Sequence, residues 1–224
     1  MESAFEVPVN FFLEGDLAAH RQFILKNSPP PISFPSGAMV SAIGETPGRC
    51  YYLLEGMVKV FTINSQGYVR LLGYHREDTV FVLDGLRGNE PCVVAIQAIT
   101  PLRVVPIPPG ELRRLGRLSP DFALDLALFV GDTLRLMCFD AENQSIWDVS
   151  TRLANFLCLY MKSRDYRANR CVPMTQENLA SAVNASRVQV ARVCARLRRA
   201  GVLETGRRRV VIRDEEALRA LSRF

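Results

Sequence analysis

The spacing of apolar positions over residues 186–199 predicts an amphipathic helix. At 100° per residue, four apolar side chains fall within one third of its circumference: Val190, Val193, Cys194 and Leu197. The opposite face centres on Val188 and carries arginines, and residues 186–199 include no acid. A solvated helix face usually mixes both signs of charge. We therefore interpret this helix as one that meets an anion.

The segments on either side of this helix have the pattern of a winged helix-turn-helix. Residues 175–183 predict a short helix capped by Thr175, and Asn184 suits the left-handed turn that follows. Ala180 supplies a small residue where the two helices touch closely. Residues 201–213 predict two short strands around a tight turn, which would form the wing. The alternative to a DNA-binding unit is an ordinary helical hairpin with a basic surface.

Residues 38–107 have a different pattern, which predicts short β-strands. Apolar runs are separated by Gly, Asn, Pro or Asp at intervals of about ten residues, a spacing typical of an all-β roll or barrel. Val58, Val60 and Thr62 occupy alternate positions, as expected for one face of an antiparallel strand.

A long helix is predicted between the β-rich segment and the helix-turn-helix. Ser119 and Pro120 can open it, and its pattern continues to about residue 146, where Trp147 and Asp148 break it. Positions spaced alternately four and three apart form a coiled-coil seam, which predicts a dimer interface: Leu126, Val130, Thr133, Met137 and Gln144. The alternative is a core helix that packs only on its own domain.

Charge is distributed unevenly along the chain. The whole sequence has a formal net charge of +5, but residues 149–224 alone carry +10 and residues 120–148 carry −5. A concentration of positive charge on the predicted helix-turn-helix favours DNA as the partner. A membrane surface is a poorer fit because the basic segment lacks exposed Trp, Phe or Leu beside its charges.

Composition gives further expectations about compartment and chemistry. The first twenty residues carry four acids and no basic segment, so we expect no signal peptide, and the six cysteines lie far apart, as in a reduced cytoplasmic protein. With two histidines and no CxxC pair, no metal site, haem or iron–sulfur cluster is expected. The sequence has no GxSxG, no HExxH and no Gly-rich phosphate loop, so we expect no enzyme.

Taken together, these segments resemble the CRP/FNR family of bacterial transcription regulators. The resemblance rests on LLEGMVKV with its Gly56 turn, on SPD before the long helix, on WDVSTRLANFL after it, and on the helix-turn-helix and wing. It implies an α+β fold: an N-terminal antiparallel β-roll of the cyclic-nucleotide-binding type, a long dimerisation helix and a C-terminal winged helix-turn-helix. The corresponding segments are a sensor domain at 1–118, the dimerisation helix at 119–147 and the DNA-binding domain at 148–224. The expected partners are a second copy of the chain, palindromic double-stranded DNA and RNA polymerase.

The resemblance also assigns residues to DNA contacts. The positions that match base-reading residues are Arg187, Val188, Gln189 and Arg192. The positions expected to contact phosphate are Thr175, Ser186, Arg196, Arg199, Arg207, Arg208 and Arg209. Relatives place Glu, which suits a cytosine amino group, where this chain has Val188. An exposed valine instead suits a thymine methyl group, which predicts AT-rich half-sites.

The chain departs from its relatives where they bind cyclic nucleotides. Cys92 and Val93 stand where those relatives have Arg-Ser, whereas Asp84 matches their acidic residue and Arg87 is a cation nearby. We therefore expect a smaller, less polar effector between the roll and the long helix, close to Leu83, Asp84, Arg87, Cys92, Val93, Thr133, Met137 and Cys138. Two alternatives remain: a constitutive regulator without an effector, and a ligand-binding roll whose C-terminal helices contact protein.

Overall fold

The computed structural model describes residues 9–86 and 90–223 and divides into two compact units. The roll unit comprises residues 12–134, and the winged-helix unit comprises residues 135–223 with residues 9–11. The division falls inside one continuous helix, α3 (Pro120–Ile146), whose bounds agree with the predicted long helix. The sequence placed domain boundaries at each end of this helix, whereas the compact units share it. Among the described helices, none is both long and apolar enough to span a membrane.

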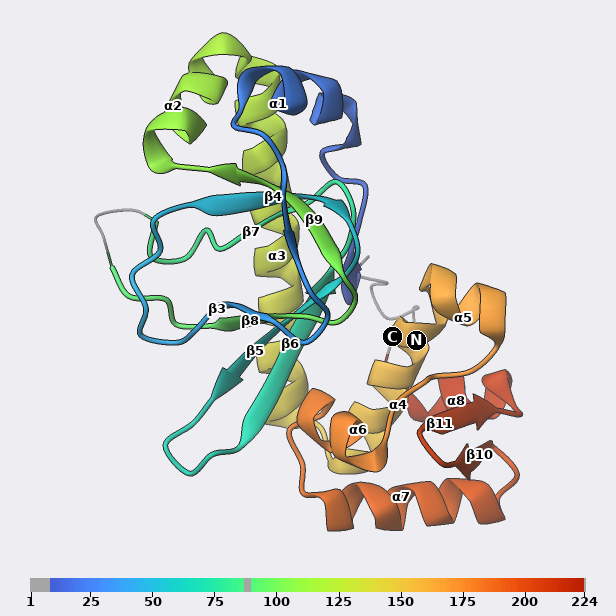
Figure 1. Cartoon of the computed structure of the whole chain (residues 1–224). Coiled ribbons are helices and arrows are strands. Elements are labelled where there is room, and N and C mark those ends of the chain that lie inside the picture. Colours follow the sequence, from blue (N-terminus) through green and yellow to red (C-terminus); the bar gives the residue numbers. More distant parts are fainter. Residues whose placement is uncertain (1–8, 87–89, 224) are drawn as a thin grey trace. The chain divides into compact units, whose positions relative to one another are not determined.

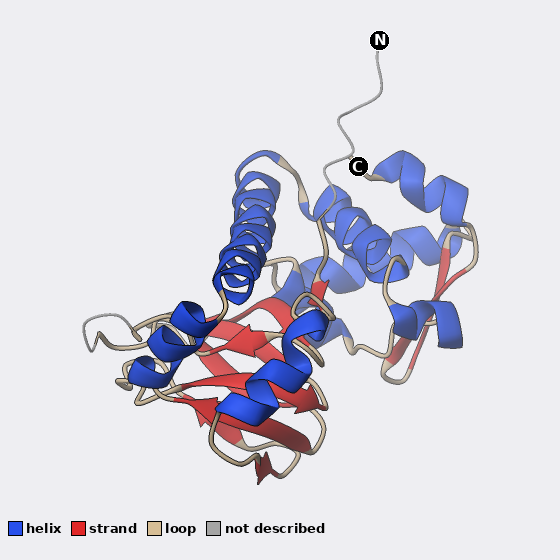
Figure 2. Cartoon of the chain, turned by 90° about the horizontal axis from the view of Figure 1, so that it is seen from above, coloured by secondary structure: helices blue, strands red, loops and turns tan. Residues whose placement is uncertain are grey.

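Two antiparallel sheets form the roll unit and confirm the predicted roll (Figures 1 and 2). One sheet has the order β1-β6-β5-β8-β3, in which β1 joins in parallel, and the other has the order β2-β9-β4-β7. The strands are β1 (Phe12–Leu13), β2 (Ile32–Phe34), β3 (Met39–Ser41), β4 (Cys50–Glu55), β5 (Val58–Ile63), β6 (Val69–His75), β7 (Val80–Phe81), β8 (Ala95–Ala98) and β9 (Leu102–Ile107).

Strand β5 departs from the alternation that its sequence suggests. Its register against β6 shifts between Val60 and Phe61. Val58 and Phe61 are buried, while Val60 and Thr62 are only half-buried. The extra residue of this β-bulge is Leu72 in β6, whereas β5 pairs with β8 without a shift. Phe61 lies in the core, although it alternates in the sequence with Val58, Val60 and Thr62.

Helices cover one side of the roll. A 3-10 turn (Ala18–His20), α1 (Arg21–Asn27), α2 (Pro109–Leu118) and the first turns of α3 pack around a core cluster that contains Ile24, Tyr52, Leu115, Phe122 and Phe129. All five side chains are 2% exposed or less. A second cluster contains buried residues of both sheets, among them Leu53 of β4 and Ile96 of β8. The roll unit therefore brings the start of α3 into its own core.

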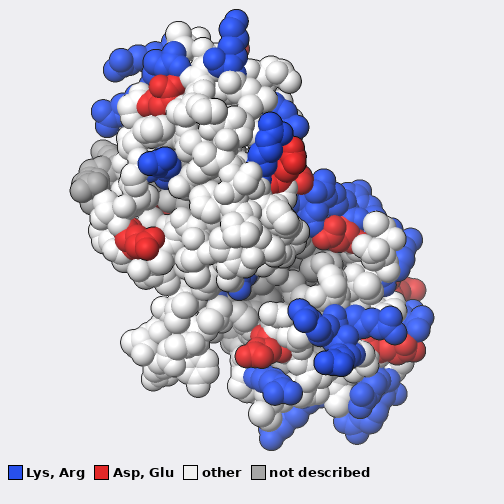
Figure 3. All heavy atoms as spheres, in the orientation of Figure 1, with Lys and Arg blue, Asp and Glu red and all other residues white. Residues whose placement is uncertain are grey.

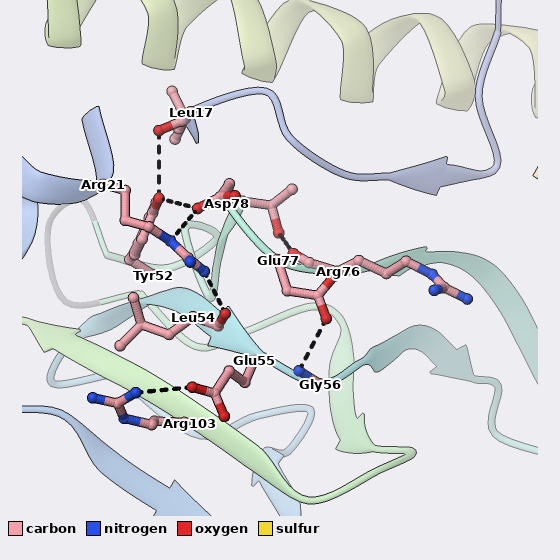
Figure 4. A network of polar contacts seen from close by, with 11 residues as sticks. Leu17, Arg21, Tyr52, Leu54, Glu55, Gly56, Arg76, Glu77, Asp78 and Arg103 are labelled. Atoms are coloured by element: carbon pink, nitrogen blue, oxygen red, sulfur yellow. Dashed lines mark hydrogen bonds and ion pairs between the residues drawn. The ribbon is translucent and has the colours of Figure 1, made fainter. Parts of the chain in front are cut away.

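A partly buried polar network fixes α1 to the sheet (Figure 4). Arg21 Nε donates to Asp78 Oδ1 at 2.8 Å, and the Tyr52 hydroxyl donates to the same carboxylate. Burial, followed by the charge and hydrogen bond of Asp78, raises the pKa of Tyr52. At the turn after β4, Gly56 has φ +105°, and a Cβ there would lie 2.4 Å from the Pro101 carbonyl oxygen, so only glycine fits.

The winged-helix unit contains the predicted helix-turn-helix and wing together with further helices. It comprises α4 (Val149–Met161), α5 (Arg164–Asn169), α6 (Gln176–Ala182), α7 (Arg187–Arg199), β10 (Leu203–Gly206), β11 (Arg209–Ile212) and α8 (Glu215–Leu221). Helices α5 and α8 were not predicted; Asp214 is the N-cap of α8, and its side chain accepts from the amide of Ala217. In Figure 2 the β10–β11 hairpin is flanked by helices of the same unit.

Candidate nucleic-acid interface and effector positions

Helix α7 buries one face and exposes the other, as its sequence pattern predicted. Val190, Cys194 and Leu197 are buried, whereas Val188 is 59% exposed and Arg192 is exposed. Basic side chains gather around α7 and the wing (Figure 3). Because the buried residues anchor α7 in the unit, its exposed face is held rigidly for contact with a ligand.

The first turn of α7 is closed by a capping box that uses two of the predicted DNA-contacting residues. Gln189 N donates to Ser186 Oγ at 3.2 Å, and Ser186 N donates to Gln189 Oε1 at 2.9 Å. Both residues and Arg187 are exposed. Gln189 Oε1 can therefore accept from a base only after this bond to Ser186 N is broken, a condition that the sequence did not reveal.

The turn between α6 and α7 has the geometry expected of a helix-turn-helix. Asn184 adopts φ +48°, the left-handed conformation predicted for it, and Ala185 N donates to Ala180 O at 3.0 Å. Thr175 caps α6 and accepts from Asn178 N at 3.1 Å. The Asn178 side chain completes a capping box, so α6 has the same type of N-terminal cap as α7.

An arginine on α4 ties this turn to the end of α3. Arg152 Nη1 donates to Gln144 Oε1 at 2.6 Å and to the Asn184 backbone oxygen at 3.2 Å. Gln144, predicted as a dimer-interface residue, thus serves a contact within its own unit. The sequence does not signal this link, because its three residues are far apart along the chain.

The wing and the starts of α6 and α7 surround a cavity of about 330 Å³. Its lining includes Thr175, Glu177, Arg187, Arg208 and Arg209. Four of these five were predicted to contact DNA. Several guanidinium groups around one cavity suit an anion such as phosphate. Arg207 lies in the same wing, between the two strands.

Two other predicted phosphate contacts have partners on the winged-helix unit. Arg196 Nη2 donates to Ser150 Oγ on α4, and Arg199 Nε donates to Ala195 O on its own helix at 3.4 Å. Asp148, the N-cap of α4, has its pKa lowered by the amide of Thr151 and, to a smaller extent, by the charge of Arg196. Ser150 thus lies beside Arg196, one of the predicted phosphate contacts, although Ser150 itself was not predicted to contact DNA.

The predicted effector positions of the roll lie around the loop between β7 and β8. Asp84 Oδ2 accepts from Val93 N at 2.9 Å and from Val94 N at 3.2 Å. Cys92 is 2% exposed, and burial is the main cause of its raised thiol pKa, whereas Val93 is 69% exposed. Leu83 packs at the edge of the roll core. Arg87 lies outside the described residues.

The remaining effector positions lie along α3. Thr133 belongs to the roll unit and donates from Oγ1 to Phe129 O at 3.2 Å. Met137 and Cys138 belong to the winged-helix unit; Met137 is half-buried and Cys138 is exposed. Within residues 9–86 and 90–223, no three His, Cys, Asp or Glu side chains cluster as metal ligands would.

The exposed apolar ridge of α3 differs from the predicted seam. Leu124, Leu128 and Leu134 are each at least 60% exposed, and Val130 is 47% exposed. Leu126, by contrast, packs against the core of its own roll. Leu126 is therefore covered within its own unit.

A roll, a long helix with an exposed apolar ridge and a basic winged helix-turn-helix together define a DNA-binding transcription regulator. Comparison with known proteins agrees: residues 31–117 match the cyclic nucleotide-binding domain and residues 151–221 match the Crp-like helix-turn-helix domain. The chain belongs to the CRP/FNR family of transcription regulators.

Individual relatives are similar over most of their length. The transcriptional regulator SdrP of Thermus thermophilus is 25% identical over 197 residues, which cover 85% of this chain and 93% of the relative. The c-di-GMP responsive global regulator CLP of Xanthomonas campestris has a TM-score of 0.78 at 20% identity, with 87% of this chain and 98% of that chain covered. A CRP/FNR family regulator from Thermus thermophilus has a TM-score of 0.72 at 23% identity, covering 85% and 97%.

Proposed function

We propose that the chain acts as a homodimer that binds a two-fold DNA site and regulates transcription through RNA polymerase. The observation that carries the proposal is α7, whose exposed face presents Arg187, Val188 and Arg192 while its other face is buried. A recognition helix of this kind enters the major groove, and two copies read half-sites one helical turn apart.

The exposed ridge of α3 supports the dimer. Leu124, Leu128, Val130 and Leu134 leave a helix face apolar in water, and such a face is stabilised when a matching helix covers it. A second copy offers the same ridge, so a two-fold axis along α3 would cover both at once. The two α7 helices then become a symmetric pair.

The exposed face of α7 supports AT-rich half-sites. Val188 lies at its centre with most of its side chain in water, and the methyl group of thymine is the base feature that covers an apolar side chain in the major groove. Arg192, one turn along, has the length to reach a guanine or a phosphate beside it. We infer a half-site that contains a TTAA-like element.

We further propose that the roll binds a small effector that is not a cyclic nucleotide. Cys92 is buried and Val93 offers only an aliphatic side chain, so neither supplies the cation that a buried phosphodiester needs. A constitutive regulator, in which the roll serves only dimerisation, is the alternative.

Selection of bound sequences from random DNA, followed by footprinting, tests the proposed function. We expect an inverted repeat with half-site centres roughly 34–36 Å apart, protected on successive major grooves. A single unrepeated half-site would contradict the dimer, and equal binding to a scrambled control would contradict sequence-specific recognition. Binding to protein but not to DNA would favour the alternative role for the C-terminal helices.

A further inference from the structure

Two consecutive backbone amides in the loop between β7 and β8 converge on one carboxylate oxygen. Val93 N and Val94 N both donate to Asp84 Oδ2, at 2.9 and 3.2 Å. Successive N–H groups that point to one place form a small concavity that binds anions. In this loop the anion is a side chain of the protein itself.

The neighbouring backbone holds these amides in position without a ligand. Cys92, immediately before them, donates its N–H to Glu45 O and accepts from Gly44 N through its own carbonyl, both at 2.8 Å. Its Sγ accepts from Ser41 Oγ at 3.3 Å and lies 3.6 Å from the Asp84 carbonyl oxygen. Because Cys92 is fixed on several sides, the direction of the next two amides is set by the fold.

The local charge opposes a second anion at this place. A phosphate that approached the amides of Val93 and Val94 would meet the Asp84 carboxylate at close range, in competition for the same donors. The charges of Asp84 and Glu45 already act on Cys92, where both contribute to the raised thiol pKa after the larger effect of burial. The electrostatic potential around the amides of Val93 and Val94 is therefore negative.

We propose that Asp84 is a built-in counter-anion, which occupies the amide pair of Val93 and Val94 and closes this part of the roll to phosphate and other anionic ligands. The inference rests on the proposed function only in treating the roll as the effector-binding part of a regulator. Asp84 then determines ligand specificity, because it excludes anionic ligands from a domain that is related to cyclic nucleotide-binding domains.

Thermal unfolding of the full chain with increasing inorganic phosphate tests the proposal. We expect the wild-type Tm to follow only the general effect of ionic strength. Asp84→Ala should lower the Tm by about 2–4 °C, because two amides lose their acceptor, and phosphate or acetate should restore it with a saturable dose dependence.

Glu55→Ala is the matched control. It removes one carboxylate from the same unit, but that carboxylate pairs with Arg103 at 2.8 Å on the surface and accepts from no converging amide pair. Saturable recovery in Asp84→Ala alone supports the proposal. An equal response to phosphate in all three proteins would overturn it.

A second measurement uses the wild-type protein, in case Asp84→Ala does not fold. The amide resonances of Val93 and Val94 should stay in place when millimolar phosphate or cyclic AMP is added. If both resonances move together on titration, the amide pair is open to external anions and the proposal fails. Neither measurement involves DNA, so the outcome is independent of whether the proposed DNA-binding function holds.

Discussion

Asn155 on α4 and Asn143 on α3 share a hydrogen bond of 2.8 Å from Nδ2 to Oδ1, with both side chains at most 5% exposed. Asn155 Oδ1 also accepts from the backbone N–H of Arg223 at 2.8 Å. One buried amide thus joins the last turns of α3 to the C-terminal segment that follows α8. Buried polar groups satisfied in this way specify one arrangement of the chain, because any other leaves a donor or acceptor unpaired.

Replacing Asn155 should destabilise the winged-helix unit. In Asn155→Ala, Asn143 Oδ1 and Arg223 N both lose their partner in a dry environment, which costs about 1–3 kcal/mol of unfolding free energy. Urea denaturation followed by circular dichroism measures this loss. Asn169→Ala, at an exposed position of α5, is the control and should change stability by less than about 0.5 kcal/mol.

The buried His75 should make the roll unit less stable in mild acid. Its ring packs edge-on against Phe81 and Phe129, and burial lowers its pKa from 6.5 to about 4. Above pH 6.5 the ring is neutral in both the folded and unfolded chain. Between pH 6.5 and 4 only the unfolded chain gains the proton, so about 3 kcal/mol is lost as the pH falls through that range.

His75→Phe removes the titrating group and keeps an aromatic ring in the same place. We expect the unfolding free energy of this variant, compared with wild type, to fall less steeply between pH 7 and 4. Contributions of the other ionisable groups cancel in the comparison. Parallel pH profiles for the two proteins would contradict the prediction.

Two arginines near the DNA interface should behave differently. Arg192→Ala should weaken binding to the selected site by about 1–3 kcal/mol and relax the preference at one base position. Arg208→Ala should weaken binding to all DNA sequences to a similar extent. It should also reduce the slope of log K against log salt concentration by about one. Arg208 has φ +60°, but alanine has the same backbone preference as arginine there, so the wing should keep its shape. Binding isotherms at several salt concentrations separate loss of base recognition from loss of a phosphate contact. Identical changes in both variants would contradict the different roles of Arg192 and Arg208.

Val188 should set the base preference at the centre of the half-site. Val188→Glu replaces a side chain that is 59% exposed, so folding should be unaffected. A carboxylate accepts from the amino group of cytosine, and the preferred base pair at one position should shift towards G·C. Repeating the selection with the variant measures this shift. An unchanged motif would show that Val188 does not read a base.

The exposed ridge of α3 should carry the dimer. Leu128→Glu puts two charges into the proposed interface of each dimer and should raise the dissociation constant by about 100-fold or more. Leu118→Glu on α2, where the leucine is 54% exposed, changes charge and size equally and should leave association intact. Sedimentation equilibrium compares the two. Equal dissociation constants would show that the interface lies elsewhere.

Much of the secondary structure could be predicted from the sequence because burial follows local periodicity. The bounds of α3 and the turn at Asn184 agree with the prediction, since capping residues and left-handed turns act over a few neighbouring positions. The bulge after Val60 could not be predicted, because it is fixed by pairing with β6 rather than by the order of residues in β5.

The choice between two faces of α3 also needed the structure. Phe122, Leu126 and Phe129 recur at intervals of four and three, as do Leu124, Leu128 and Gly131. Either set can form a coiled-coil seam by periodicity alone. The roll covers the first set and leaves the second exposed, and that outcome depends on contacts between segments far apart in the sequence. The contacts of Asp84 and Arg152 were unpredictable for the same reason.

Trp147 lies between α3 and α4, and the guanidinium of Arg223 lies 5.7 Å from the centre of its ring. It is the single tryptophan of the chain. Indole emission depends on nearby charge and on water, so the tryptophan fluorescence of the unlabelled protein reports on this junction alone. An effector or a DNA site that shifts the C-terminal segment would change the emission colour, which gives the winged-helix unit an intrinsic optical sensor where α3 meets α4.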